Sequence, residues 1–171
     1  MKSRKSGFTL IEIVVTLAVA SILAAMIFQI FSSVYSVYRK INDMAEYQSY
    51  AQVIMIRIKN ELKYADSVTI ENDIPASIVP GNRYIYVTDG TPQLNVGNSS
   101  SDAVSIAKLS SGFSAELIFT KSSDKSIRVS VSIKNKGTIV YNLDADVYLN
   151  NIVNDSISGS SQGLVIRYTL P

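Results

Sequence analysis

The stretch FTLIEIVVTLAVASILAAMIFQIF, residues 8–31, decides the fold of this chain. It contains one charged residue, Glu12, and no further charge follows until Arg39. About 20 apolar residues are enough to span a bilayer as an α-helix. No proline or glycine occurs between Phe8 and Ile74, so the helix is expected to continue well beyond the apolar stretch.

The composition supports a segment in lipid and excludes several kinds of chemistry. The chain has 171 residues, of which 47% are hydrophobic and 18% charged, whereas soluble domains carry about 25% charged residues. Cysteine, histidine and tryptophan are absent. Disulfide scaffolds, cysteine or histidine nucleophiles, the Ser-His-Asp triad and almost every zinc site are therefore excluded. No phosphate-binding loop or carboxylate pair stands out, so we expect neither an enzyme nor a bound cofactor or metal.

The basic residues gather at the N-terminus. Lys2, Arg4 and Lys5 precede the apolar stretch, and the net charge of the chain is only +2. Basic residues beside a membrane span stay on the cytoplasmic side. This predicts a single-pass protein with a cytoplasmic N-terminus and its C-terminal part outside. The small net charge gives no indication of direct nucleic-acid binding.

Three ordinary explanations of the apolar stretch remain. It could be a secretory signal peptide cut after Ala18-Val19-Ala20, a plain membrane anchor, or a buried core helix. Two features weaken the signal-peptide explanation. Glu12 lies within what would be its apolar core, and cleavage after Ala20 would leave an apolar stretch at the new N-terminus. A small soluble domain rarely encloses a helix that is apolar all round.

Glu12 calls for a partner. A carboxylate at the centre of a bilayer costs roughly 2.5–3.5 kcal/mol and is by default functional. The next basic residue, Arg39, lies about 40 Å further along a helix and is out of reach. The partner must therefore come from another chain, or from a new amine made near Phe8.

Residues 6–12, SGFTLIE, resemble the leader-cleavage motif of type IV pilins and pseudopilins. The resemblance implies that a prepilin peptidase cuts between Gly7 and Phe8 and then N-methylates Phe8. It also implies that Glu12 of an incoming subunit pairs with the Phe8 amine of a neighbour. Such a pair in hydrocarbon would set the axial register, since an unpaired charge there is costly. The implied partners are the peptidase, other pilin subunits, membrane lipid before assembly and assembly platform proteins. The implied final location is an extracellular or periplasmic filament.

The second half of the helix carries an apolar stripe. Its spacing of three and four residues is typical of a helix that packs along one side. We expect the helix to end near Ala65 and the stripe to pack against the chain's own following domain, with a free coiled-coil dimer as the alternative. The stripe comprises Val34, Val37, Ile41, Met44, Gln48, Ala51, Met55, Ile58, Leu62 and Ala65.

Short alternating segments after the helix predict an antiparallel sheet. We expect a turn at residues 121–125 and another at residues 135–137, which together would give a three-strand meander. The fold class is therefore α+β, a long N-terminal helical spine packed against an antiparallel sheet, as the pilin resemblance also implies. The expected strands are residues 83–88, 103–109, 115–120, 126–134, 138–143 and 164–170.

These observations divide the chain into four parts. Residues 1–7 form a basic leader, residues 8–31 a transmembrane and filament-core helix, residues 32–65 an amphipathic continuation, and residues 66–171 a globular sheet domain. A set of oxygen-bearing residues could bind calcium, but their spacing matches no EF-hand loop, so a polar loop is their expected role. That set is Asp144, Asp146, Asn150, Asn151, Asn154 and Asp155.

A weaker resemblance concerns the kind of subunit. Residues 57–65 (RIKNELKYA) and 163–171 (GLVIRYTLP) look similar to larger minor pseudopilins of the J or W kind. We therefore expect a structural minor subunit of a pilus, competence or secretion pseudopilus, which helps to initiate assembly or forms the tip. The alternative is a membrane-tethered or secreted binding module that does not assemble.

Overall fold

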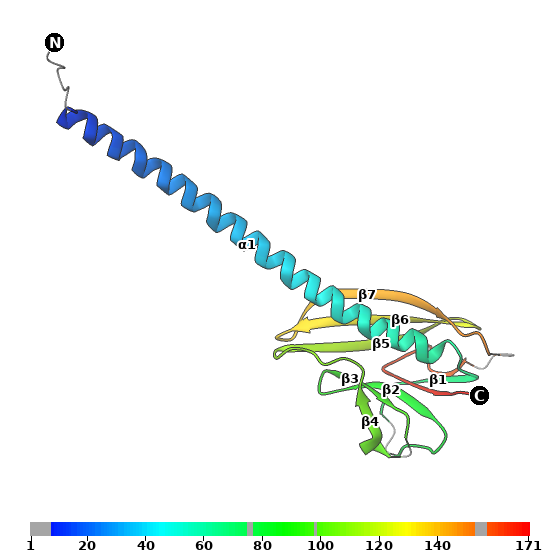
Figure 1. Cartoon of the computed structure of the whole chain (residues 1–171). Coiled ribbons are helices and arrows are strands. Elements are labelled where there is room, and N and C mark those ends of the chain that lie inside the picture. The colour runs from blue at the N-terminus through cyan, green and yellow to red at the C-terminus, as the bar shows by residue number, and fades with distance from the viewer. Residues whose placement is uncertain (1–7, 75–76, 98, 153–156) are drawn as a thin grey trace, which may run out of the picture. The chain divides into compact units, whose positions relative to one another are not determined.

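The computed structural model describes residues 8–74, 77–97, 99–152 and 157–171 (Figure 1). Its helix, α1, covers Leu10–Leu62, slightly less than the expected residues 8–65. The start is fixed by Thr9, whose hydroxyl accepts a hydrogen bond from the Glu12 amide at 3.4 Å. At the end, the Ala65 amide bonds the Leu62 carbonyl at 3.0 Å, a tighter turn that closes the helix.

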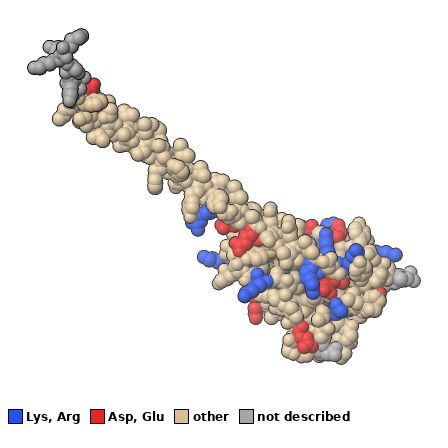
Figure 2. Space-filling view, viewed as in Figure 1, with Lys and Arg blue, Asp and Glu red and all other residues tan. Residues whose placement is uncertain are grey.

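The chain divides into two compact units, the first ending at Asp43 and the second covering Met44–Pro171. In the first unit, every described residue is exposed to solvent. Figure 2 shows this part of α1 almost without charge. Such a surface is expected of a segment whose surroundings are lipid or other apolar helices.

The second unit contains a six-stranded sheet in the order β4-β3-β2-β10-β1-β8. All neighbouring strands are antiparallel except β1 and β8, which are parallel. The strands are β1 (Ser67–Glu71), β2 (Arg83–Thr88), β3 (Thr91–Asn95), β4 (Ala103–Ser105), β8 (Ile157–Gly159) and β10 (Val165–Thr169).

A four-stranded antiparallel sheet has the order β7-β6-β5-β9. Lys136 and Gly137, with φ of 50° and 84°, form the turn between β6 and β7. Positive φ at both central residues gives a hairpin turn that suits the twist of its strands. The strands are β5 (Phe113–Ser123), β6 (Ser126–Asn135), β7 (Thr138–Tyr148) and β9 (Gln162–Gly163).

The core lies between the C-terminal part of α1 and the sheets. Ile54, Ile58 and Leu62 of the helix are fully buried in one cluster with the apolar faces of both sheets. Along β6, Val129 and Val131 are buried while Arg128 is exposed, the alternation that a strand with one covered face requires. The expected α+β fold, a long helix packed against antiparallel strands, is confirmed.

Several strand predictions need correction. The expected strand at residues 103–109 is limited to Ala103–Ser105, and the expected turn at residues 121–125 is mostly strand, since β5 continues to Ser123. β7 runs on to Tyr148 because Tyr148 still pairs with Ser126 of β6. The sequence pattern did not indicate β1, β3, β8 or β9. Two of these have three residues or fewer, too short for a periodic pattern.

The apolar stripe is buried over only part of its length. Ala51, Met55, Ile58 and Leu62 are buried, with Ile54 added to them. Upstream, Val34, Val37, Ile41 and Met44 are exposed by 45% or more.

Candidate functional site

The first turn of α1 holds a reciprocal pair of hydrogen bonds between Thr9 and Glu12. The backbone N–H of Thr9 donates to Oε2 of Glu12 at 2.9 Å, and the Thr9 hydroxyl donates to the same oxygen at 2.9 Å. The Glu12 amide donates back to the Thr9 hydroxyl. This is a capping box, in which side chains at the first and fourth positions satisfy amides that the helix leaves free. The arrangement also places the carboxylate at the positive end of the helix dipole.

Three hydroxyl groups in and just after the apolar part of α1 bond carbonyls of the same helix. The Thr16 hydroxyl donates to the Glu12 carbonyl at 2.8 Å, and the Ser21 hydroxyl to the Ala18 carbonyl at 2.7 Å. Ser33 bonds the Gln29 carbonyl in the same way. In hydrocarbon each unsatisfied polar group is expensive, so a helix that satisfies its own hydroxyls is suited to lipid.

The length and composition of α1 also suit a lipid environment. Among the described residues, one helix is long and apolar enough to cross a membrane, with a mean hydropathy of 2.6 in its best window and none of that window buried. The described N-terminal segment therefore fits a membrane anchor.

The structure places the predicted site residues in part. Phe8 precedes the helix and is 83% exposed, and Glu12 lies in the first turn. Gly7, the other side of the expected cleavage site, and the basic leader lie outside the described residues. Thr9 was not among the predicted site residues. The spacing of Thr9 and Glu12, Thr-x-x-Glu before an apolar run, was the signal that could have found it.

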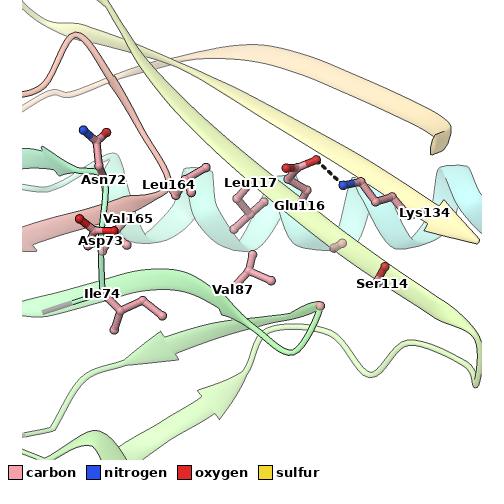
Figure 3. A pocket seen from close by; sticks show the side chains of 12 residues that line it. Asn72, Asp73, Ile74, Val87, Ser114, Glu116, Leu117, Lys134, Leu164 and Val165 are labelled. Atoms are coloured by element: carbon pink, nitrogen blue, oxygen red, sulfur yellow. Dashed lines mark ion pairs between the residues drawn. The ribbon is translucent and has the colours of Figure 1, made fainter. Parts of the chain in front are cut away.

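A cavity of about 570 Å³ lies in the second unit, beside the β2–β3 turn (Figure 3). Glu116 and Lys134 form an ion pair across 2.8 Å at its wall, and most of the other lining side chains are apolar. Besides this pair, the lining comprises Asn72, Asp73, Ile74, Val87, Gly90, Ser114, Ala115, Leu117, Leu164 and Val165.

The candidate calcium residues are not gathered as ligands. Asp144 and Asp146 lie on β7, where Asp146 pairs with Arg128 at 3.1 Å, while the Asn151 side chain bonds the Tyr64 carbonyl. Asn154 and Asp155 lie outside the described residues. Within the part of the chain that the structure describes, no group of three or more His, Cys, Asp or Glu residues could hold a metal ion.

Known proteins resemble this chain in two respects, the N-terminal sequence and the fold. A family model, the prokaryotic N-terminal methylation motif, matches residues 2–28. No curated protein sequence matches the chain. Among solved structures, the PilB minor pilin from Streptococcus sanguinis is similar, with a TM-score of 0.52 and 12% sequence identity. The similarity covers 74% of this chain but 34% of PilB, so the chain spans about a third of that structure's length. The chain therefore carries a prokaryotic N-terminal methylation motif at residues 2–28, and its fold is similar to that of a minor pilin.

Proposed function

We propose that the chain is a structural minor subunit of a type IV pilus-like filament. In this proposal, a prepilin peptidase removes residues 1–7 by cutting between Gly7 and Phe8, and Phe8 is N-methylated. Glu12 then docks the subunit to the Phe8 amine of a neighbour. The apolar part of α1, residues 8–31, anchors the precursor in lipid and later lies in the filament core. Residues 32–65 continue the spine, and residues 66–171 form the outward domain.

The geometry of Glu12 is the observation that carries the proposal. Among the described residues, Thr9 donates two hydrogen bonds to the Glu12 carboxylate, one from its backbone N–H and one from its hydroxyl. Both end on Oε2. An ionised carboxylate accepts at both oxygens, so Oε1 can still accept a bond from a cation. Cleavage before Phe8 would create such a cation one helical turn before Glu12 in the same chain, and an identical amine in each neighbour. A charge-assisted bond to it is about twice as strong as a neutral one.

The region around the proposed cut supports processing. Phe8 and Thr9 precede the first helical residue, Leu10, so the bond before Phe8 does not have to be drawn out of a helix. The three basic residues of the leader favour a cytoplasmic N-terminus with the sheets outside. The proposed location is the cytoplasmic membrane, followed by an extracellular or periplasmic filament.

The minor-subunit role rests on the likeness to a minor pilin and on the ends of the spine and the chain. The fold resembles that of the PilB minor pilin, and residues 57–65 and 163–171 look similar to minor pseudopilins of the J or W kind. We propose that the subunit helps to initiate assembly or lies at the tip, in contact with sibling subunits and assembly platform proteins. The retained Glu12 allows it to dock beneath another subunit.

The N-terminal mass of the protein, isolated from membranes of its host with and without the prepilin peptidase, tests processing. We expect a chain that starts at N-methyl-Phe8 only when the peptidase is present. A chain that starts at Ser21, or an uncut Met1, would contradict the proposal and leave the secreted or tethered module.

Docking is tested separately with Glu12→Gln. This change keeps the shape of the side chain and an oxygen for Thr9 but removes the charge. We expect cleavage at the wild-type level and loss of the subunit from sheared filaments. Thr16→Val is the control, since its hydroxyl bonds only helix carbonyls. Normal incorporation of Glu12→Gln would contradict docking by charge.

A further inference from the structure

The edge strands of the two sheets differ greatly in length. Among the described strands, β4 and β8 are the edges of one sheet, and β7 and β9 those of the other. β4 and β8 have three residues each and β9 has two, whereas β7 has 11. Proteins usually protect long edges with charged side chains, above all lysine, or with proline, a bulge or a covering segment. β7, with the sequence TIVYNLDADVY, has a bulge at Val140 and two aspartates further on, but no lysine, arginine, proline or glycine, so the charges along its edge are all acidic.

The backbone of β7 offers a row of donors and acceptors at this edge. The Lys121 amide of β5 bonds the Ser161 carbonyl at 2.9 Å, away from β6. Bonding directions alternate along antiparallel strands, so the even-numbered residues of β5 and β6 bond each other and the odd-numbered residues of β6 face β7. From Tyr141 onward, beyond the register shift, these odd-numbered residues of β6 pair with odd-numbered residues of β7. The Leu149 amide, which bonds the Lys125 carbonyl at 3.0 Å, fits this alternation. The N–H and C=O groups of Asn142, Asp144 and Asp146 therefore point to the open edge, with which no described strand pairs.

The side chains of β7 define what could pair there. Asn142, Asp144 and Asp146 are exposed on the outer face of the sheet. Asp146 receives two bonds from Arg128, at 3.1 and 3.2 Å, whereas Asp144 receives one from the Asn142 amide group at 3.2 Å. On the inner face, Leu143 is only half-buried against the core. A fifth strand would thus meet acidic side chains on one face and uncovered apolar surface on the other.

We propose that the outer edge of β7 binds an extended segment of another protein chain as a fifth strand, and that this segment alternates apolar and basic residues. β6 shows the pattern that fits. It meets β7 from the other side with Val129 and Val131 on the inner face and Arg128 opposite Asp146. A segment of the same character on the open edge would cover Leu143 and place a basic side chain beside Asp144. In Figure 1, β7 (orange) forms the margin of its sheet. The site lies wholly within Met44–Pro171 and does not depend on docking at Glu12.

The test uses a fluorescent peptide with the β6 sequence SIRVSVSIKN and the full-length chain in detergent micelles. Binding is followed by fluorescence anisotropy, and hydrogen exchange of the β7 amides locates it. In the control peptide, glutamate replaces both the arginine and the lysine of this sequence. We expect saturable binding of the first peptide, protection of the β7 amides, and binding of the control weaker by about fivefold or more, because like charges opposite each other destabilise a strand pair.

Two variants of the protein make the test specific. Asp144→Pro removes an N–H from the open edge without removing a bond to β6, and we expect binding to weaken by about tenfold. Asp144→Lys keeps the N–H and reverses the charge, so it should weaken binding of the basic peptide and strengthen binding of the acidic control peptide. Asp66→Lys, the same change at another exposed residue, should leave the binding of both peptides unchanged.

Three results would overturn the proposal. The first is no binding of either peptide to the wild-type chain. The second is equal binding to the wild type and Asp144→Pro, with near-UV circular dichroism showing that the variant is folded. The third is self-association through β7, detected by sedimentation as a dimer that Asp144→Pro dissolves, which would make the occupant a second copy.

Discussion

The phenol of Tyr168 donates a hydrogen bond to the carboxylate of Glu61 at 3.0 Å and so joins β10 to the end of α1. Arg83 of β2 donates to the same carboxylate oxygen at 3.2 Å, and Arg57 pairs with the other at 3.3 Å. The Glu61 side chain is 14% exposed, so most of its contact with water is lost. Its charge is balanced by two arginines, which is what a mostly buried carboxylate requires.

This contact predicts how stability depends on pH. Burial, and then the nearby negative charge of Glu61, raise the pKa of Tyr168 above its ordinary value. The unfolded tyrosine loses its proton near pH 10, while the folded one keeps it. Stability from this residue is therefore full below about pH 10 and falls as pH rises further.

The change Tyr168→Phe tests this dependence by chemical unfolding of the full-length chain. At neutral pH we expect the free energy of unfolding to fall by about 1–3 kcal/mol, because the variant lacks the hydrogen bond to the charged Glu61 carboxylate. Above about pH 10, the loss of stability should be smaller in the variant than in the wild type. Tyr148→Phe, at a residue 70% exposed, is the control and should follow the wild type at every pH.

A second prediction concerns the packing of the spine. Ile58 is fully buried and Ile56, two residues before it, is 58% exposed. We expect Ile58→Ala to lower the free energy of unfolding by about 2–5 kcal/mol through lost burial and a cavity. Ile56→Ala, the same change in the same helix, should stay within about 0.5 kcal/mol. Equal effects in urea unfolding would show that this face of α1 is not what holds the sheets.

A third prediction compares two glycines with the same φ of 90°, Gly112 and Gly159. A Cβ at Gly159 would lie 2.2 Å from the carbonyl oxygen of Ile70, whereas one at Gly112 would meet nothing within 4 Å. Gly112→Ala should cost about 1–2 kcal/mol in backbone strain alone. Gly159→Ala should cost more, since β8 must also move away from β1. Thermal unfolding of the two variants measures the difference.

A fourth prediction concerns Thr9 in the proposed assembly. Thr9→Val keeps the shape of the side chain but removes the hydroxyl that bonds Glu12. The loss of a cap costs about 1 kcal/mol, so we expect cleavage to continue while the processed subunit reaches sheared filaments several-fold less often. Thr9→Ser retains a hydroxyl and should restore incorporation. If both variants assemble like the wild type, the capping box has no part in docking.

Local patterns in the sequence were enough for much of this fold. The absence of proline and glycine after Phe8 predicted one long helix, because nothing interrupts its hydrogen bonding. The sequence of residues 135–137 predicted the turn that Lys136 and Gly137 form, since glycine adopts a positive φ without strain. Strict alternation predicted β6, a strand with one covered face. Each of these signals lies within a few neighbouring residues.

The sequence by itself determined the apolar helix, the lone carboxylate at residue 12 and the α+β class, because each follows from residues close together along the chain. Only the tertiary structure decided that β8 and β9 form, since strands of three and two residues depend on partners in β1 and β5. It also decided that Glu61 meets Tyr168, 107 residues further on. Where burial of the spine begins, at Ala51, depends on the reach of the sheets. Contacts between distant residues follow from how layers pack, which no local pattern specifies.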